Sequence, residues 1–168
     1  MVLDAAIYPT SDYPEDQKLP HVILTTHVVH RGIPIGAVVS SIIPLTSRYI
    51  LRRPTAKALP LSTLLIRSNS TGLLVTSGLM VGMTLGRMAG RDLIEWQDRS
   101  WRLLRNEGQN QLDDFSAAGG VTGAVVGLAS RGGLPLWRGV LGGFGLGALA
   151  GTAAFAAYKA SASKKADE

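Results

Sequence analysis

The chain has 168 residues, of which 46% are hydrophobic and only 17% are charged, and its net charge is +5. Soluble proteins carry about 25% charged residues, so long parts of this chain lack the polar surface that water requires. The chain has no cysteine, which excludes disulfides, thiolate metal sites and cysteine nucleophiles. Its basic residues do not form one patch interleaved with aromatic residues, so we expect no nucleic-acid partner.

An acidic segment, residues 1–20, precedes the first apolar run. It contains four carboxylates and one lysine. A secretory signal begins with basic residues, and a mitochondrial presequence is rich in arginine, so the segment is typical of neither. We expect this segment to lie outside the membrane, and any organelle address to lie further along the chain.

Four apolar runs follow, and a helix needs about 20 such residues to cross a bilayer. Each run is apolar around its whole circumference, which leaves almost no polar face for water. The alternative is the buried helical core of a soluble protein, which the short third run alone would favour. We predict an all-α integral membrane domain of four transmembrane helices, followed by a polar tail. The helices are expected near residues 21–46, 61–89, 115–131 and 134–158, the domain over 21–158 and the tail over 159–168.

The connectors between these runs differ in charge. The first, RYILRRPTAKALP, has four basic residues and no acidic one, and the third, SRGGLPLW, is followed by another arginine. The second, from Arg87 to Asp114, has six acidic residues against five basic ones. Positive connectors stay on the side that corresponds to the bacterial cytoplasm. Both termini and the second connector are therefore expected on the opposite side.

Small residues recur at every fourth position in all four runs. This spacing keeps them on one helix face. Helices in lipid associate through close van der Waals contact, which small residues allow. Chance spacing in helices rich in alanine and glycine is the alternative. The glycines that we expect to form helix-packing surfaces are Gly32, Gly36, Gly78, Gly82, Gly86, Gly119, Gly123, Gly127, Gly139, Gly143, Gly147 and Gly151.

The second connector contains a predicted amphipathic helix over residues 91–107, where no glycine or proline occurs. Tryptophan and arginine are typical anchors at protein interfaces, and tryptophan is equally common at the headgroup level of a membrane. Both interpretations, docking on a partner and resting on lipid, stay open. The candidate docking residues are Trp96, Trp101, Arg102 and Arg105.

The three histidines, His21, His27 and His30, lie at or near the start of the first run. No carboxylate or cysteine stands beside them at the spacing that metal ligands require. We therefore expect structural or headgroup-level histidines and no bound metal.

Four charged residues lie at the edges of the apolar runs. Arg31 and Arg67 are expected to extend to the membrane surface, although an ionisable residue within a membrane is a functional candidate. Asp113 and Asp114 directly precede the third run. We expect them to cap its helix, where acidic residues favour the N-terminal dipole. A general acid/base pair is the alternative.

Four glycine-striped helices, an arginine-bearing first connector and an acidic pair before the third helix resemble the Tim translocase family of the mitochondrial inner membrane. The resemblance covers residues 25–158, and the most similar member is the accessory subunit in the membrane arm of respiratory complex I. The family's import signature places an arginine four residues before the aspartate, but Gln109 stands there and the nearest arginine is Arg105. The residues that suggest the family are Asp113, Asp114, Gly119, Gly120, Gly123, Gly127, Arg131 and the glycines of 139–151.

The resemblance implies a non-catalytic accessory subunit that stabilises or assembles the membrane arm of complex I (NADH:ubiquinone oxidoreductase). It implies no cofactor, although a structural phospholipid would be compatible. The implied partners are the core membrane-arm subunits, membrane lipids and neighbouring respiratory complexes. Both termini would face the intermembrane space. A subunit of a protein-import translocase is the alternative and would need a polar stripe facing a cavity, and a small-solute carrier is a third option.

Overall fold

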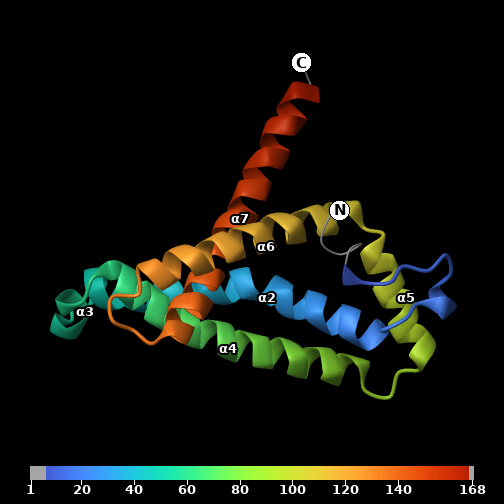
Figure 1. Ribbon diagram of the computed structural model, residues 1–168, viewed down its shortest axis with the longest axis horizontal. Coiled ribbons are helices and arrows are strands. Elements are labelled where there is room, and N and C mark those ends of the chain that lie inside the picture. The colour runs from blue at the N-terminus through green and yellow to red at the C-terminus, as the bar shows by residue number, and fades with distance from the viewer. Residues whose placement is uncertain (1–6, 167–168) are drawn as a thin grey trace.

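The computed structural model describes residues 7–166, and all of the regular structure in that range is helical. Figure 1 shows α2, α4 and α6 running along the length of the molecule, whereas the C-terminal part of α7 extends beyond them. The long helices are α2 (Pro20–Leu45), α4 (Leu61–Met88), α6 (Glu107–Ala129) and α7 (Leu136–Ala166). The short elements are η1 (Pro14–Asp16), the π-helical turn η2 (Thr46–Ile50), α3 (Pro54–Ala58) and α5 (Leu93–Leu104).

Helices α6 and α7 extend further than predicted. α6 begins at Glu107 because Asn106 caps it, with its side-chain oxygen accepting from the Gln109 N–H at 3.1 Å. Asp113 and Asp114 therefore lie inside the helix, and the prediction that they cap it is wrong. α7 continues through the expected polar tail to Ala166, since no glycine or proline interrupts that part of the chain.

Helices α2 and α4 form an antiparallel pair with contacts at every fourth residue. Each contact sets a small residue on one helix against a side chain on the other. A Cβ added to Gly36, for example, would lie 2.9 Å from the Thr76 Cβ. The approach is thus limited by side chains rather than by backbone. The facing positions are Gly32 with Met80, Gly36 with Thr76, and Ser40 with Gly72.

Helix α2 contains two prolines, Pro34 and Pro44. A proline cannot donate the helical hydrogen bond to the carbonyl four residues earlier, which for Pro44 is the carbonyl of Ser40. Ser68 of α4 supplies a replacement, because its hydroxyl donates to the Ser40 carbonyl oxygen at 2.6 Å. Packing against α4 therefore gives the Ser40 carbonyl oxygen the hydrogen bond that Pro44 cannot donate.

Helices α6 and α7 form a second antiparallel pair, at backbone distance. A Cβ added to Gly147 would lie 2.8 Å from the Gly123 Cα, so glycine on both helices permits the approach. The turn before α7 uses Gly132 and Gly133 at φ +57° and +83°, a region that favours glycine. The facing positions are Gly127 with Gly139, Gly123 with Gly143, Gly119 with Gly147, and Phe115 with Gly151.

The glycine stripe of α4 does not take part in either pair. A Cβ added to Gly78, Gly82 or Gly86 would meet no atom within 4 Å. The inward face of this part of α4 is instead formed by Thr84 and Met88, which are 5% and 3% exposed. Residues two positions apart point to nearly opposite sides of a helix. Contrary to the prediction, these three glycines do not pack against another helix among the described residues.

Polar and apolar side chains are not separated in this fold as they are in soluble proteins. Large hydrophobic residues are exposed along the helices: Ile35 is 62%, Leu79 59% and Val125 67% exposed. Water does not favour a surface of this kind over long stretches. Two helices in the described chain, Pro20–Ile50 and Leu136–Lys164, are long and apolar enough to cross a membrane. The buried polar or charged residues, about as many as the buried hydrophobic ones, are Gln17, Ser40, Thr63, Asn69, Ser70, Thr84, Ser100, Asn110, Asp113 and Ser116.

Candidate functional site

Three charged or titratable side chains meet between α2 and α6. Asp113 of α6 lies opposite His27 and Arg31 of α2, which a spacing of four places on one helix face. Asp113 Oδ2 is 2.7 Å from His27 Nδ1, and Asp113 Oδ1 is 2.8 Å from Arg31 Nε. The side chains of Asp113, His27 and Arg31 are 11%, 15% and 29% exposed. This group is called the His27–Arg31–Asp113 cluster below.

The cluster compensates the charges that it buries. The contact of Arg31 with Asp113 lies off the line of the N–H bond, so it is an ion pair rather than a directed hydrogen bond. Arg31 also donates from Nη2 to the Gln109 carbonyl oxygen at 3.2 Å, which gives the guanidinium a second anchor on α6. Because an unpaired charge is costly away from water, these contacts hold α2 and α6 in one relative position.

A cavity of about 590 Å³ adjoins the cluster, and its walls are mostly apolar. Asn110 lines it and is 1% exposed. Its Nδ2 donates to the Leu104 carbonyl oxygen at 2.8 Å, which ties α6 to the end of α5. Asn110 Oδ1 and His30 Nε2 have no hydrogen-bond partner among the described residues. Buried polar atoms of this kind are usually satisfied by water or by a bound polar group.

The chemistry of the cluster follows from its members. A histidine–aspartate pair can position an imidazole to activate a hydroxyl, a thiol or a water molecule. Among the described residues, no protein hydroxyl forms a hydrogen bond with His27, whose Nδ1 is paired with Asp113. Residues 7–166 also contain no group of three His, Cys, Asp or Glu side chains placed to hold a metal ion. The geometry provides an electrostatic link between α2 and α6.

The histidines and Arg31 differ from their predicted environments. The carboxylate that the local sequence lacked beside His27 comes from α6, far along the chain. His21 instead lies against Trp96, with ring centroids 4.4 Å apart. Arg31 turns into the cluster, so the prediction that it extends to the surface is wrong, because Asp113 and the Gln109 carbonyl oxygen hold its guanidinium against α6. Arg67 is exposed, near the start of α4.

Most of the candidate docking residues contact this chain itself. Trp96 is 6% exposed and lies within the fold. Trp101 Nε1 and Arg105 Nη1 both donate to the Ser11 carbonyl oxygen, at 3.1 and 3.0 Å. The guanidinium of Arg105 also lies 4.1 Å from the Trp101 ring centroid. Trp101 and Arg105 thus hold the N-terminal segment against α5. Arg102 stays exposed and pairs with a carboxylate one turn earlier.

Three polar residues of this region were not predicted to contribute: Asn106, Gln109 and Asn110. A sequence signal was available for the first two. An asparagine followed three residues later by glutamine is typical of the start of a helix, and here Asn106 caps α6 by accepting from Gln109. No local signal identifies Asn110, because its partner belongs to α5 and its burial depends on tertiary packing.

The sequence matches the model of one protein family. The model of a family described as protein of unknown function (DUF1757) matches residues 15–154. The chain belongs to the DUF1757 family. The matched range contains the facing positions of both helix pairs and the His27–Arg31–Asp113 cluster, whereas α7 continues beyond it to Ala166. No curated protein matches the sequence.

Proposed function

We propose that this DUF1757 protein is a membrane-embedded, non-catalytic accessory subunit of mitochondrial complex I that stabilises or assembles its membrane arm. One observation carries the membrane part of the proposal: large hydrophobic side chains are exposed along the helices, whereas polar residues are buried about as often as hydrophobic ones. In water this arrangement exposes apolar surface and buries polar groups, both of which are unfavourable. In lipid the same outer surface is solvated by hydrocarbon.

The finer proposal is that four helices span the membrane. α2 and α7 meet the requirement of length and composition. α4 has 28 residues, and its polar Asn69 and Ser70 are 1% and 0% exposed, so they face protein rather than lipid. α6 carries its acidic residues in its first turns, where Asp113 is paired, and continues into an apolar stretch.

The placement of charge supports an orientation. The α2–α4 connection and the α6–α7 turn lie at the same end of the molecule (Figure 1). Positive connectors at this end would face the mitochondrial matrix, which leaves the termini in the intermembrane space. The basic residues in and directly after these two connectors are Arg48, Arg52, Arg53, Lys57, Arg131 and Arg138.

The assignment to complex I is supported by the resemblance to the Tim translocase family described above. The exposed apolar faces of the helices are suited to pack against other membrane subunits, as an accessory subunit requires. The proposed partners are the core membrane-arm subunits, lipids and neighbouring respiratory complexes. The His27–Arg31–Asp113 cluster would then serve to fix α2 against α6 and not to catalyse a reaction.

Alkaline extraction of mitochondrial membranes tests the membrane part. The proposal expects the chain in the pellet at high pH, together with an integral membrane marker. A peripheral protein that is released into the supernatant serves as the control. Recovery of the chain in the supernatant would refute the proposal in full.

A mild-detergent native gel with mass spectrometry along the lane tests the assignment to complex I. The chain is expected to co-migrate with complex I subunits, and its deletion is expected to lower the amount of assembled membrane arm. Co-migration with a much smaller import complex would favour the translocase instead.

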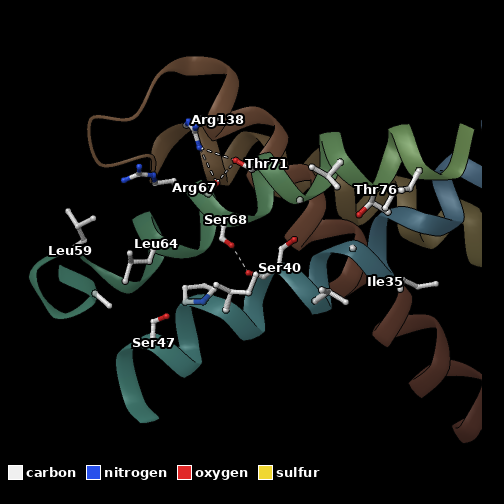
Figure 2. Close-up of a pocket in the computed structure, with 18 of the residues that line it drawn as sticks. Ile35, Ser40, Ser47, Leu59, Leu64, Arg67, Ser68, Thr71, Thr76 and Arg138 are labelled. Atoms are coloured by element: carbon white, nitrogen blue, oxygen red, sulfur yellow. Dashed lines mark hydrogen bonds between the residues drawn. The ribbon is translucent and has the colours of Figure 1, made fainter. Parts of the chain in front are cut away.

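One observation favours the translocase as the second candidate. Ser40 and Thr76, hydroxyl residues that a conduit would need, line a groove of about 890 Å³ between α2 and α4 (Figure 2). If the groove is an import path, a translocating precursor protein should cross-link to photoreactive residues placed at Ser40 and Thr76. The absence of such cross-links would contradict the translocase.

A further inference from the structure

The groove of Figure 2 lies between α2, α3 and α4 and reaches the start of α7. Its volume of about 890 Å³ lies near the top of the range of roughly 300–1,000 Å³ that is typical of sites for small organic molecules. A single inorganic ion would leave most of this space empty. The apolar residues along it are Ile35, Val39, Ile43, Pro44, Leu59, Leu64, Val75, Leu79 and Met80.

The charge of the groove has one sign. Arg53, Arg67 and Arg138 line it, and its lining includes no aspartate or glutamate. None of the three arginines forms an ion pair within the described residues. Figure 2 shows Arg67 and Arg138 close together at one end, whereas Ile35 and Thr76 lie at the other. The groove thus has a cationic end and an apolar length.

The guanidinium of Arg138 is held in place at the cationic end. Its Nη1 lies 3.1 Å from the Arg67 carbonyl oxygen, 3.3 Å from Ser70 Oγ and 3.4 Å from Thr71 Oγ1. The Cζ atom of this guanidinium lies over the Trp137 ring, 4.6 Å from the ring centroid. All of its hydrogen bonds to described residues use Nη1, so Nε and Nη2 can bind an anion. A planar guanidinium with two such donors matches the oxygens of a phosphate.

We propose that this groove binds one anionic phospholipid. The headgroup phosphate lies between Arg67 and Arg138, and an acyl chain follows the apolar length past Val39 and Leu79. The inference rests on the membrane-embedded part of the proposed function but not on the assignment to complex I. Basic residues at the membrane surface attract anionic headgroups, and the apolar walls distinguish a lipid from free phosphate, which has no chain to bury.

Native mass spectrometry of the full chain, purified in mild detergent from mixed phosphatidylglycerol and phosphatidylcholine, tests the proposal. The wild type is expected to retain one phosphatidylglycerol per chain. Because each hydrogen bond to a charged group is strong, R67Q is expected to lower retention about tenfold, and R67Q with R138Q further. R87Q is the matched control, since Arg87 is exposed on the same helix but does not line the groove; it is expected to retain the lipid.

A second pair of variants tests the apolar walls while leaving the charges in place. Ile43→Trp fills the groove and should displace the lipid, whereas Ile42→Trp changes an exposed neighbour outside the groove and should not. The helical content of each variant, measured by circular dichroism, shows whether it is folded. If R138Q fails to fold, R67Q and Ile43→Trp still decide the question.

Four outcomes would overturn the inference. They are equal retention in R67Q and R87Q, equal retention in both tryptophan variants, equal retention of phosphatidylcholine, and thermal stabilisation by inorganic phosphate equal to that by phosphatidylglycerol. The last would identify a phosphate site without a lipid. Loss of the lipid proposal leaves membrane embedding intact, because alkaline extraction tests that separately.

Discussion

The two helix pairs, α2/α4 and α6/α7, both pack closely, but different atoms limit the approach of the helices in each pair. Both are antiparallel and both make contact at every fourth residue. In α6/α7 the atoms that would obstruct a new Cβ belong mostly to the facing backbone, whereas in α2/α4 they belong to side chains such as Met80 and Thr76. A side chain can change its rotamer, but a helix backbone moves only as a unit. Small residues at equal spacing therefore carry unequal constraints.

The two pairs also differ in polar contacts. Across α2/α4, Ser68 donates to the Ser40 carbonyl oxygen, and Asn69 Nδ2 donates to Ser41 Oγ at 3.0 Å. Across α6/α7 the side-chain contacts include aromatic rings, with the Phe115 and Phe155 centroids 5.6 Å apart, whereas the hydroxyl of Thr122 donates within its own helix. Along its glycines the α6/α7 pair is held by close backbone contact, and it should be the more sensitive to any added atom.

The largest effect is expected where backbone faces backbone. Gly143→Leu places a side chain against the Gly127 Cα, 2.9 Å from the position of the new Cβ. We expect the free energy of unfolding in mixed micelles to fall by about 3 kcal/mol, the upper end of overpacking costs. Gly82→Leu is the control, because its Cβ would meet nothing within 4 Å. An equal loss in both variants would contradict the backbone-contact account.

The next effect concerns the junction between the pairs. Asp113→Asn removes the charge that compensates Arg31, which is 29% exposed. We expect a loss of about 2 kcal/mol in unfolding free energy, less than for a fully buried pair. Asp98→Asn serves as the control, because its partner Arg102 is 72% exposed and such pairs contribute about 0–1 kcal/mol. A loss of similar size in the control would show that the cluster has no special role.

A smaller effect is expected where a side chain is the obstacle. Gly32→Ala meets Met80, whose flexible side chain can move aside. The loss in unfolding free energy should be about 1 kcal/mol or less, and it should vanish in a Met80→Ala background. Gly123→Ala meets backbone atoms of α7 instead. No second substitution that shortens a side chain can therefore restore its stability. A full-sized loss at Gly32 in the Met80→Ala background would remove the distinction between the pairs.

The smallest effect lies outside both pairs. Arg105→Ala removes one of two donors to the Ser11 carbonyl oxygen, while Trp101 remains. We expect about 0.5 kcal/mol of local destabilisation, seen as faster hydrogen exchange over residues 11–17 with no change in either helix pair. Arg102→Ala should leave that exchange unchanged. Faster exchange in α6 or α7 would mean that the N-terminal segment supports the pairs as well.

The positions of the helices were largely predictable from sequence. The bounds of α2 and α4 lie within one residue of the prediction, and Pro20 and Pro60 mark the starts of the two helices. The start of α6 was misplaced, because the acidic pair was weighed above Asn106. The apolar pattern predicts that a helix forms. Which polar residue caps it depends on tertiary contacts, because Asp113 pairs with His27 and Arg31 whereas Asn106 is left to cap α6.

The candidate site was less predictable than the helices. Asp113 and His27 were both noted in the sequence, but their pairing depends on how α6 meets α2. Equal spacing also failed to separate the glycines that pack from those that do not: Gly82 and Gly143 belong to the same kind of stripe. Spacing determines which residues share a face, but only tertiary structure determines what that face meets.

The Pro44 position in α2 has a consequence for biogenesis. If α2 spans a membrane as proposed, a lone α2 entering the bilayer would place the Ser40 carbonyl in hydrocarbon without the donor that proline cannot supply. Ser68, which supplies that donor, is synthesised later, on the helix that follows. Release of the first two helices together, as a hairpin, from the insertion machinery avoids this unsatisfied intermediate. Lateral exit into lipid is then expected to wait until Ser68 has been made.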